Sequence, residues 1–184
     1  MNPLTACLLA MCVAAAPRPA PEVRVVLEPG LVKKSTERDA LLDEARECIA
    51  ALRAVLDTPA ARAHFQQHYH LQPTRILDRE DFAVIVRGFP RHAGPAGVQV
   101  GGYVFGESTV DLNVAVLRGA LRARDRKVWR RYTAGVLVHE LAHLADFLDD
   151  GVNNDGGITN AEEGDAAQIA VGCSLRPPGV LPEE

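Results

Sequence analysis

Apolar and polar positions in the first part of the chain predict two consecutive helices. Across residues 35–57 apolar side chains recur every three to four positions, the period of an amphipathic helix with one buried face. Thr58 is a favourable helix N-cap and Pro59 suits the first helical turn. A second helix is therefore expected to continue to about Tyr69.

Short runs of β-branched residues predict a small sheet. Residues 23–28 and 82–87 have the length and composition of strands. Residues 98–105 and 109–116 flank a turn at 106–108, and apolar residues alternate strictly along the second run. This pattern indicates a β-hairpin with one buried face.

Two more helices are expected towards the C-terminus. The first covers about residues 126–150, and residues 149–157 then have the Asp, Asn and Gly content of a loop. The second begins at Thr159 or Asn160, either of which can cap it, and ends near Gly172. The expected fold class is α+β, with a small mixed sheet whose edge hairpin packs on these two helices.

The sequence His-Glu-Leu-Ala-His lies within the helix expected at residues 126–150. His139 and His143 are four residues apart, so their imidazoles project from one helix face a turn apart, as two zinc ligands require. Glu140 follows the first histidine, where its carboxylate reaches the water on the metal instead of the metal itself. Because the surrounding segment is mostly apolar, these polar groups need a functional reason to be there.

A catalytic zinc site needs a third protein ligand and an open position for water. Glu162 and Glu163 at the start of the last helix are the candidates. We favour Glu162 because it shares a helix face with Asp165, which could accept a hydrogen bond from a zinc-bound histidine. Glu163 remains the alternative, and one of the two glutamates is expected to form a capping box with Thr159 or Asn160.

These residues resemble the zincin metallopeptidases, and within them the gluzincins, which combine His-Glu-x-x-His with a glutamate on a later helix. The resemblance covers about residues 98–172, and the paired glutamates are similar to those of clostridial neurotoxin light chains, in which the first is the ligand. Thermolysin-type enzymes place a supporting aspartate four residues after the ligand, whereas Asp165 lies three after Glu162. The resemblance implies one catalytic Zn²⁺ ion, peptide-bond hydrolysis by a zinc-bound water that Glu140 activates, and substrate backbone added to the hairpin as a further strand.

Other polar residues are candidates for supporting roles or for exclusion. The metzincin pattern would place a third ligand at Asp149, but it requires a glycine where Asp146 stands, and an unbroken helix carries Asp149 away from the metal. Asp146 is expected to support the second histidine of the motif or to be solvated. Tyr103 and Tyr132 are the candidate tyrosines at the substrate edge or the oxyanion, with His92 as a loop candidate.

A second histidine pair, His64 and His68, has the same four-residue spacing as the motif. Phe65 stands where the glutamate of the motif would be. We therefore expect these histidines to be polar residues on the surface of an amphipathic helix.

The length and charge of the chain indicate one domain and no basic surface for binding nucleic acid. A length of 184 residues allows a single core, and the formal net charge is −4. The basic cluster in residues 122–131 is expected to solvate one helix end. Cys48 and Cys173 could form a disulfide if the chain is exported, and the alternative is a pair of buried thiols.

The N-terminal residues have features of a targeting segment. Residues 1–16 contain an apolar run too short to cross a bilayer and are predicted to be a signal peptide, followed by a proline-rich linker at 17–22. The metallopeptidase domain would span 23–176, with a flexible tail at 177–184. A secreted or periplasmic protein without a stable membrane span is expected, and a cytoplasmic protein or a delivered effector is the alternative.

The sequence as a whole predicts a zinc metalloendopeptidase whose partner is a peptide or protein substrate. A compact zincin of this kind resembles small metallopeptidases that bacteria secrete or deliver as effectors. One alternative is therefore a toxin protease with a single protein target. The other is a zinc-binding interaction module that no longer cleaves, although the intact Glu140 speaks against it.

Overall fold

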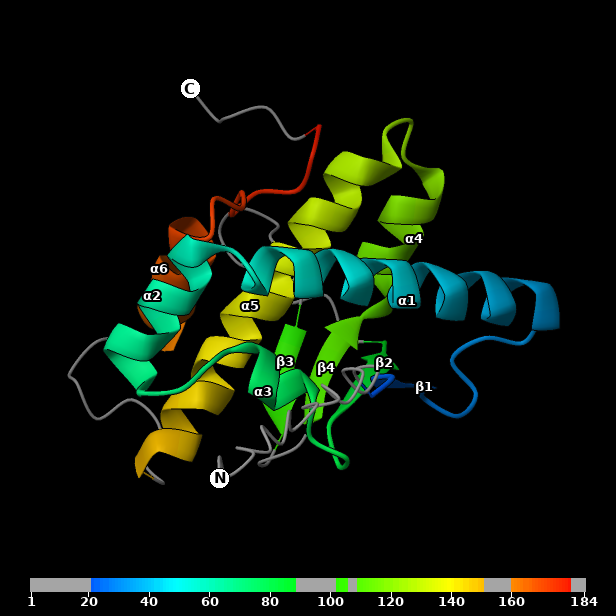
Figure 1. The fold of residues 1–184 in the computed structure, drawn as a ribbon. Helices are drawn as coiled ribbons and strands as arrows, with labels where there is room; N and C mark the ends of the chain where they lie inside the picture. The colour runs from blue at the N-terminus through cyan, green and yellow to red at the C-terminus, as the bar shows by residue number, and fades with distance from the viewer. Residues whose placement is uncertain (1–20, 89–101, 106–108, 151–159, 180–184) are drawn as a thin grey trace, which may run out of the picture.

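The computed structural model describes residues 21–88, 102–105, 109–150 and 160–179, which form four strands and six helices (Figure 1). In chain order these are β1 (Arg24–Leu27), α1 (Ser35–Leu56), α2 (Pro59–Tyr69), α3 (Thr74–Leu77), β2 (Ala83–Arg87), β3 (Gly102–Phe105), β4 (Thr109–Asn113), α4 (Val114–Arg122), α5 (Arg126–Asp150) and α6 (Asn160–Ala170). Within these ranges, no helix is both long enough and apolar enough to cross a membrane.

The strands form a mixed sheet in the order β1-β2-β4-β3. β1, β2 and β4 are parallel, and β3 pairs antiparallel with β4 at the end of the sheet. Val110 of β4 lies between Val84 of β2 and Val104 of β3. The predicted α+β class, with a small mixed sheet and an edge hairpin, is confirmed.

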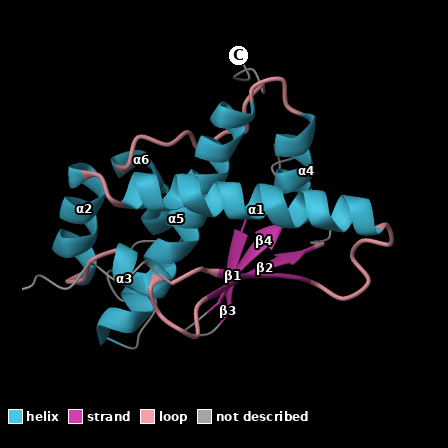
Figure 2. Cartoon of the chain, turned by 45° about the vertical axis from the view of Figure 1, so that its right-hand side comes forward, coloured by secondary structure: helices cyan, strands magenta, loops and turns pink. Residues whose placement is uncertain are grey.

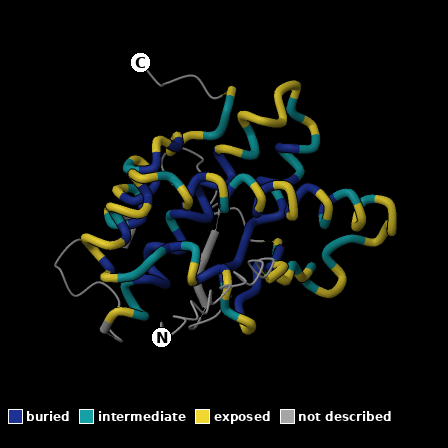
Figure 3. The backbone as a smooth tube through the Cα atoms, viewed as in Figure 1, coloured by how far each residue is buried: buried dark blue, intermediate teal, exposed yellow. Residues whose placement is uncertain are grey.

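Helix α1 runs across the molecule and covers the core. Its apolar stripe is buried, and it packs against α4, α5 and β1 (Figure 2). Figure 3 shows buried and exposed positions alternating along α1, as the predicted amphipathic period requires. The side chain of Thr58 accepts a hydrogen bond from the backbone N–H of Ala61 and caps α2, so the predicted start of that helix is also confirmed.

Helices α5 and α6 approach each other closely because each contributes a glycine to their contact. A Cβ added at Gly135 of α5 would lie 2.6 Å from the Cβ of Cys173, just beyond α6. A Cβ added at Gly164 of α6 would collide with the ring of His139. Glycine in a helix interior lowers helix stability, so its presence here indicates a steric requirement for close approach.

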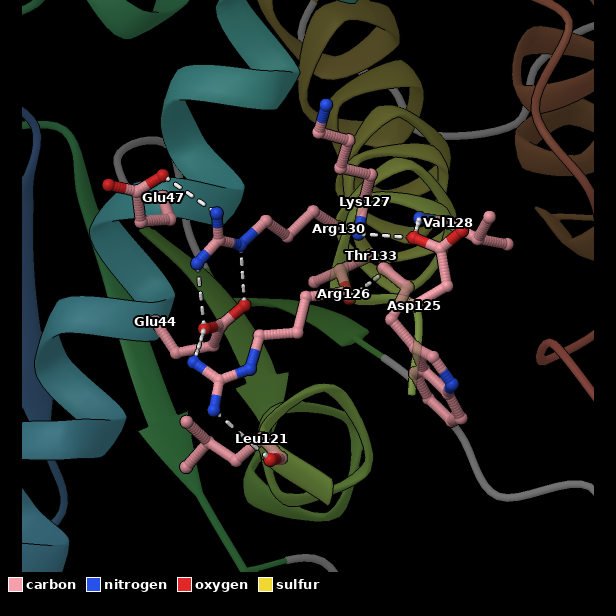
Figure 4. Close-up of polar contacts among 10 residues, drawn as sticks. Glu44, Glu47, Leu121, Asp125, Arg126, Lys127, Val128, Arg130 and Thr133 are labelled. Carbon is pink, nitrogen blue, oxygen red and sulfur yellow. Dashed lines mark hydrogen bonds and ion pairs between the residues drawn. The ribbon is translucent and has the colours of Figure 1, made fainter. Parts of the chain in front are cut away.

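A buried ion pair fixes α1 to the beginning of α5 (Figure 4). Glu44 is 2% exposed, and Arg130 donates to it from Nε at 2.7 Å and from Nη2 at 3.0 Å. Arg126 approaches the same carboxylate at 3.9 Å, and Glu47 receives the third contact of Arg130. The basic cluster therefore does more than solvate a helix end, since Arg130 neutralises a carboxylate of the core.

One expected strand needs correction, and two helices were not expected. The strand expected at 109–116 ends at Asn113, because the Asn113 side chain accepts a hydrogen bond from the backbone N–H of Ala115 and caps α4. Val114 and Val116 are buried as expected, but on a helix. The short helix α3 and helix α4 were not predicted. The start of the strand expected at 98–105 and most of the loop expected at 149–157 lie outside the described part of the chain.

Cys48 and Cys173 are free and buried, so the structure has the pair of thiols and not the disulfide. Burial is the main cause that raises the pKa of Cys48 to about 12, and the side chain of Thr133 opposes this shift in part. A thiol with such a pKa stays protonated and behaves as a small apolar group.

Candidate metal centre

Helix α5 presents the His-Glu-Leu-Ala-His motif towards α6. The ring centroids of His139 and His143 are 5.0 Å apart, with the ring planes at 82°. Glu140 and His143 are buried, and His139 is partly exposed. The predicted arrangement, with two imidazoles one turn apart on a helix, is therefore present.

Each histidine of the motif has a carboxylate from α6 at its Nδ1 atom. His139 Nδ1 lies 3.1 Å from Asp165 Oδ1, and His143 Nδ1 lies 3.2 Å from Glu163 Oε2. A carboxylate only accepts hydrogen bonds, so Nδ1 is the donor in each contact, and a neutral imidazole held in this way carries its free lone pair on Nε2. This is the tautomer that a histidine needs in order to bind a metal through Nε2.

The surroundings of His139 favour its neutral form. Burial and the neighbouring His143 lower the pKa of His139, and the carboxylate of Asp165 opposes this shift only in part. A neutral imidazole is the form that coordinates metal ions. The electrostatics and the hydrogen bonding of this histidine therefore agree with a ligand role.

Glu140 lies in an environment that disfavours its charged form. Burial raises the pKa of Glu140 to about 7, the negative charge of Asp111 adds to the effect, and His143 opposes it. Asp111 comes from β4, is fully buried, and pairs with Arg87 Nε at 2.8 Å. A carboxyl group with a pKa near 7 can both accept and release a proton at neutral pH.

Glu163 is contacted from α2 as well as from α5. Burial is the main cause that raises the pKa of the Tyr69 hydroxyl, and the neighbouring Glu163 carboxylate adds to the shift. His64 lies close enough for the charge of Glu163 to act on its pKa, although burial and His68 lower that pKa overall. Sequence reasoning did not identify Tyr69 or Asp111, and the only signal for Tyr69 is its four-residue spacing from the buried Phe65.

The two candidate glutamates lie in different environments. Glu162 is exposed, whereas the side chain of Glu163 is 13% exposed and faces His143. In the parts of the chain that the structure describes, no three histidine, cysteine, aspartate or glutamate side chains are arranged to hold one metal ion. The structure thus brings together two histidines and two supporting carboxylates, and the third ligand stays a prediction.

The other predicted residues are spread around this centre. Asp165 has the position expected for a histidine support, while Asp146 lies near enough to Tyr69 to raise the pKa of its hydroxyl. Asp149 pairs with His70 Nδ1 at 3.1 Å, outside the cluster of motif and α6 residues. Tyr103 stands opposite Asp111 in the β3–β4 register, but its side chain is outside the described part, as is His92.

Tyr132 and the second histidine pair differ from expectation in informative ways. Tyr132 is buried two turns before the motif and packs against Trp129, with ring centroids 5.7 Å apart, which does not place it at the histidines. His68 is exposed as expected. His64 is only partly exposed and has its Nε2 shielded from solvent, because the α2 face that carries it turns towards α6.

No protein-family model, no curated protein and no solved structure matches this chain.

Proposed function

We propose that the chain is a zinc-dependent metallopeptidase. The observation that carries the proposal is the pair of Nδ1–carboxylate contacts, His139 with Asp165 and His143 with Glu163. In a pair of histidines that only faces solvent, there would be no need for a carboxylate to orient the Nδ1 atom of each ring. Two imidazoles held in the metal-binding tautomer, with a buried carboxyl group between them in sequence, support a hydrolytic metal centre.

His139 and His143 would hold one zinc ion through Nε2, and Glu162 would be the third ligand. Glu163 is the alternative, but its carboxylate is already engaged by His143 and Tyr69. Glu162 lies on the same helix face as Asp165, three residues earlier, and this shared face is the reason to prefer it as the ligand. The donor set of two imidazoles and a carboxylate is one that catalytic zinc sites use.

Glu140 would act as the general base and then as the general acid. When bound, zinc supplies the Lewis acidity that lowers the pKa of water and polarises the scissile carbonyl. Glu140 takes a proton from the attacking water, whose oxygen forms a bond to the carbonyl carbon. As the carbon–nitrogen bond breaks, Glu140 passes that proton to the leaving amine.

The position of β3 supports an extended peptide as substrate. β3 ends the described sheet, pairs there with β4 alone and packs against α5, the helix that carries the motif. A substrate strand added at this edge would run beside Glu140 and the histidines. Secretion and a single protein target, as for a bacterial toxin, remain proposals that go with this function.

Zinc content and peptide cleavage, measured together, test the proposal. The wild-type chain should contain about one zinc per molecule by mass spectrometry and should cleave a mixture of unstructured peptides. Glu140→Gln should retain zinc and lose cleavage by about 10²- to 10⁴-fold, because Gln cannot move the proton. His143→Ala, as the matched change at a ligand, should lose the zinc as well.

The remaining outcomes separate the alternatives. Wild-type protein that takes up no zinc refutes the metal centre. Zinc uptake without cleavage of any peptide favours the interaction module, and cleavage that survives Glu140→Gln rules out the assigned base.

A further inference from the structure

The carboxylate of Glu163 lies between two elements that are far apart in the sequence. From α5, His143 Nδ1 lies 3.2 Å from Glu163 Oε2, and from α2 the hydroxyl of Tyr69 interacts with the same carboxylate. Helix α2 packs against both α5 and α6, and Figure 1 shows the three helices side by side. A chain of polar contacts thus runs from Tyr69 through Glu163 to His143.

Tyr69 is held in place independently of this chain. It is the last residue of α2 and is 3% exposed, and its ring packs against Phe65 with a centroid distance of 5.2 Å. His70 follows with a φ of 51°, the left-handed conformation that ends the helix. The position of the Tyr69 hydroxyl is therefore set by the fold and not by Glu163.

The carboxylates that contact His139 and His143 differ in how firmly they are held in place. Asp165, the partner of His139, has a side chain that is 45% exposed, whereas the Glu163 side chain is 13% exposed and also interacts with Tyr69. A half-exposed carboxylate can turn towards water, but a buried one with two fixed partners cannot. The His143 half of the centre is accordingly the better oriented of the two.

We infer that Tyr69 is a positioning residue of the metal centre, which acts through Glu163 to fix the orientation and the Nδ1–H tautomer of His143. The expected effect on metal affinity rests on the proposed function. The geometry of the inference rests on the contacts described above. It also assigns Glu163 to a supporting role, which leaves the ligand role to Glu162. His64, the remaining group near Glu163, is expected to be neutral and to add no charge there.

Tyr69→Phe removes only the hydroxyl and tests this inference. Zinc affinity, measured by competition with a chromophoric chelator, should fall about 10- to 100-fold, the usual effect of losing a group that orients a histidine ligand. Tyr132→Phe is the matched control, because Tyr132 is also a buried tyrosine but only burial shifts its pKa. It should change the zinc affinity less than about twofold, and the absorption spectrum of the cobalt-substituted protein should change in Tyr69→Phe alone.

A double substitution tests whether Tyr69 acts through Glu163. In a Glu163→Ala background, Tyr69→Phe should have no further effect on zinc affinity. An equal loss in both backgrounds would mean that Tyr69 acts by another route and would overturn the inference. So would an unchanged zinc affinity in Tyr69→Phe itself.

Nitrogen-15 NMR of the metal-free protein gives a readout that does not depend on zinc. His143 should carry its proton on Nδ1 in the wild type, and Tyr69→Phe should increase the population with the proton on Nε2. If the tautomer shifts but the wild type binds no zinc, the proposed function fails while the action of Tyr69 on His143 through Glu163 stands. If zinc binds but neither tautomer nor affinity changes, only the role of Tyr69 fails.

Discussion

Two glutamates of the core, Glu44 on α1 and Glu140 on α5, are buried to nearly the same extent but in opposite electrostatic surroundings. They are 2% and 7% exposed. Arg130 meets Glu44 with two hydrogen bonds, whereas Glu140 has no lysine or arginine partner among the described residues and lies near the negative charge of Asp111. One carboxylate is neutralised by a cation, and the other is left to shift its pKa to about 7.

The difference separates a carboxylate that stabilises the fold from one that is placed for chemistry. A buried charge must be paired or must become neutral, because desolvation costs several kcal/mol. Glu44 follows the first route and Glu140 the second. An unpaired buried acid next to two oriented histidines is the arrangement expected at a functional site.

Removal of Arg130, the cation that pairs with Glu44, should have the largest effect on the stability of the chain. Arg130→Ala would leave the charge of Glu44 buried and unpaired, so the free energy of unfolding should fall by about 3–5 kcal/mol in urea titrations. Arg126→Ala is the control on the same helix, since Arg126 is mostly exposed and lies 3.9 Å from the same carboxylate. Its loss should cost less than about 1 kcal/mol. Equal effects of the two substitutions would contradict the assigned role of Arg130.

Replacement of Glu44 and of Glu140 by glutamine should change the free energy of unfolding in opposite directions. Glu44→Gln should destabilise the chain, because Arg130 would lose its counter-charge in a buried site. Glu140→Gln should stabilise the metal-free chain at pH 8 by up to about 3 kcal/mol, the free energy that corresponds to a pKa raised from 4.5 to about 7. Unfolding in urea at pH 8, with a chelator present, measures both differences.

The pH dependence of these two variants follows from the sign of the shift. The folded state of the wild type binds the Glu140 proton more tightly than the unfolded state, so this group makes the metal-free chain less stable as pH rises from about 4.5 to 7. Above about pH 7 the contribution is constant. Glu140→Gln should remove this slope, and a wild type and variant with parallel stability curves over that range would refute the raised pKa.

The contact of Gly164 with His139 should have a moderate effect on stability and a clear one on metal binding. In Gly164→Ala the new methyl group would collide with the imidazole, so a loss of about 1–3 kcal/mol is expected from overpacking. The displaced ring should also weaken zinc binding. Gly135→Ala is the matched control in the same helix contact, since its Cβ would meet Cys173 and Gln168 instead of a histidine. It should destabilise the chain but leave the zinc affinity of the folded protein unchanged.

The helices with a clear apolar period were predictable, and the boundary at β4 was not. α1, α2 and α5 have long periodic patterns or distinct caps, which fix their place within a residue or two. The alternation of apolar residues continues through Val114 and Val116 into α4, because both side chains are also buried in the protein core as part of that helix. The cap at Asn113 decided the outcome, and a single asparagine in an alternating run gives little warning of it.

The part of the candidate site that lies on one helix could be predicted, and the part that depends on packing could not. His139, Glu140 and His143 are placed by the helix period alone. Successive residues of α6 point about 100° apart, so the rotation of that helix decides which of Glu162 and Glu163 meets His143. That rotation depends on the close approach at Gly164, a glycine inside a helix that was the available signal in the sequence.

The smallest expected effect concerns Glu47, the second carboxylate that Arg130 contacts. Arg130 Nη1 lies 3.0 Å from Glu47 Oε2, nearly the same distance as its contacts with Glu44, but the Glu47 side chain is 58% exposed. Water screens an exposed pair and solvates either partner when the other is removed, so Glu47→Gln should change the free energy of unfolding by less than about 1 kcal/mol. A loss as large as that of Glu44→Gln would mean that contact with Arg130, and not burial, governs the energetics of this cluster. The contrast between Glu44 and Glu140 would then need another explanation, because it assumes that burial makes the missing cation matter.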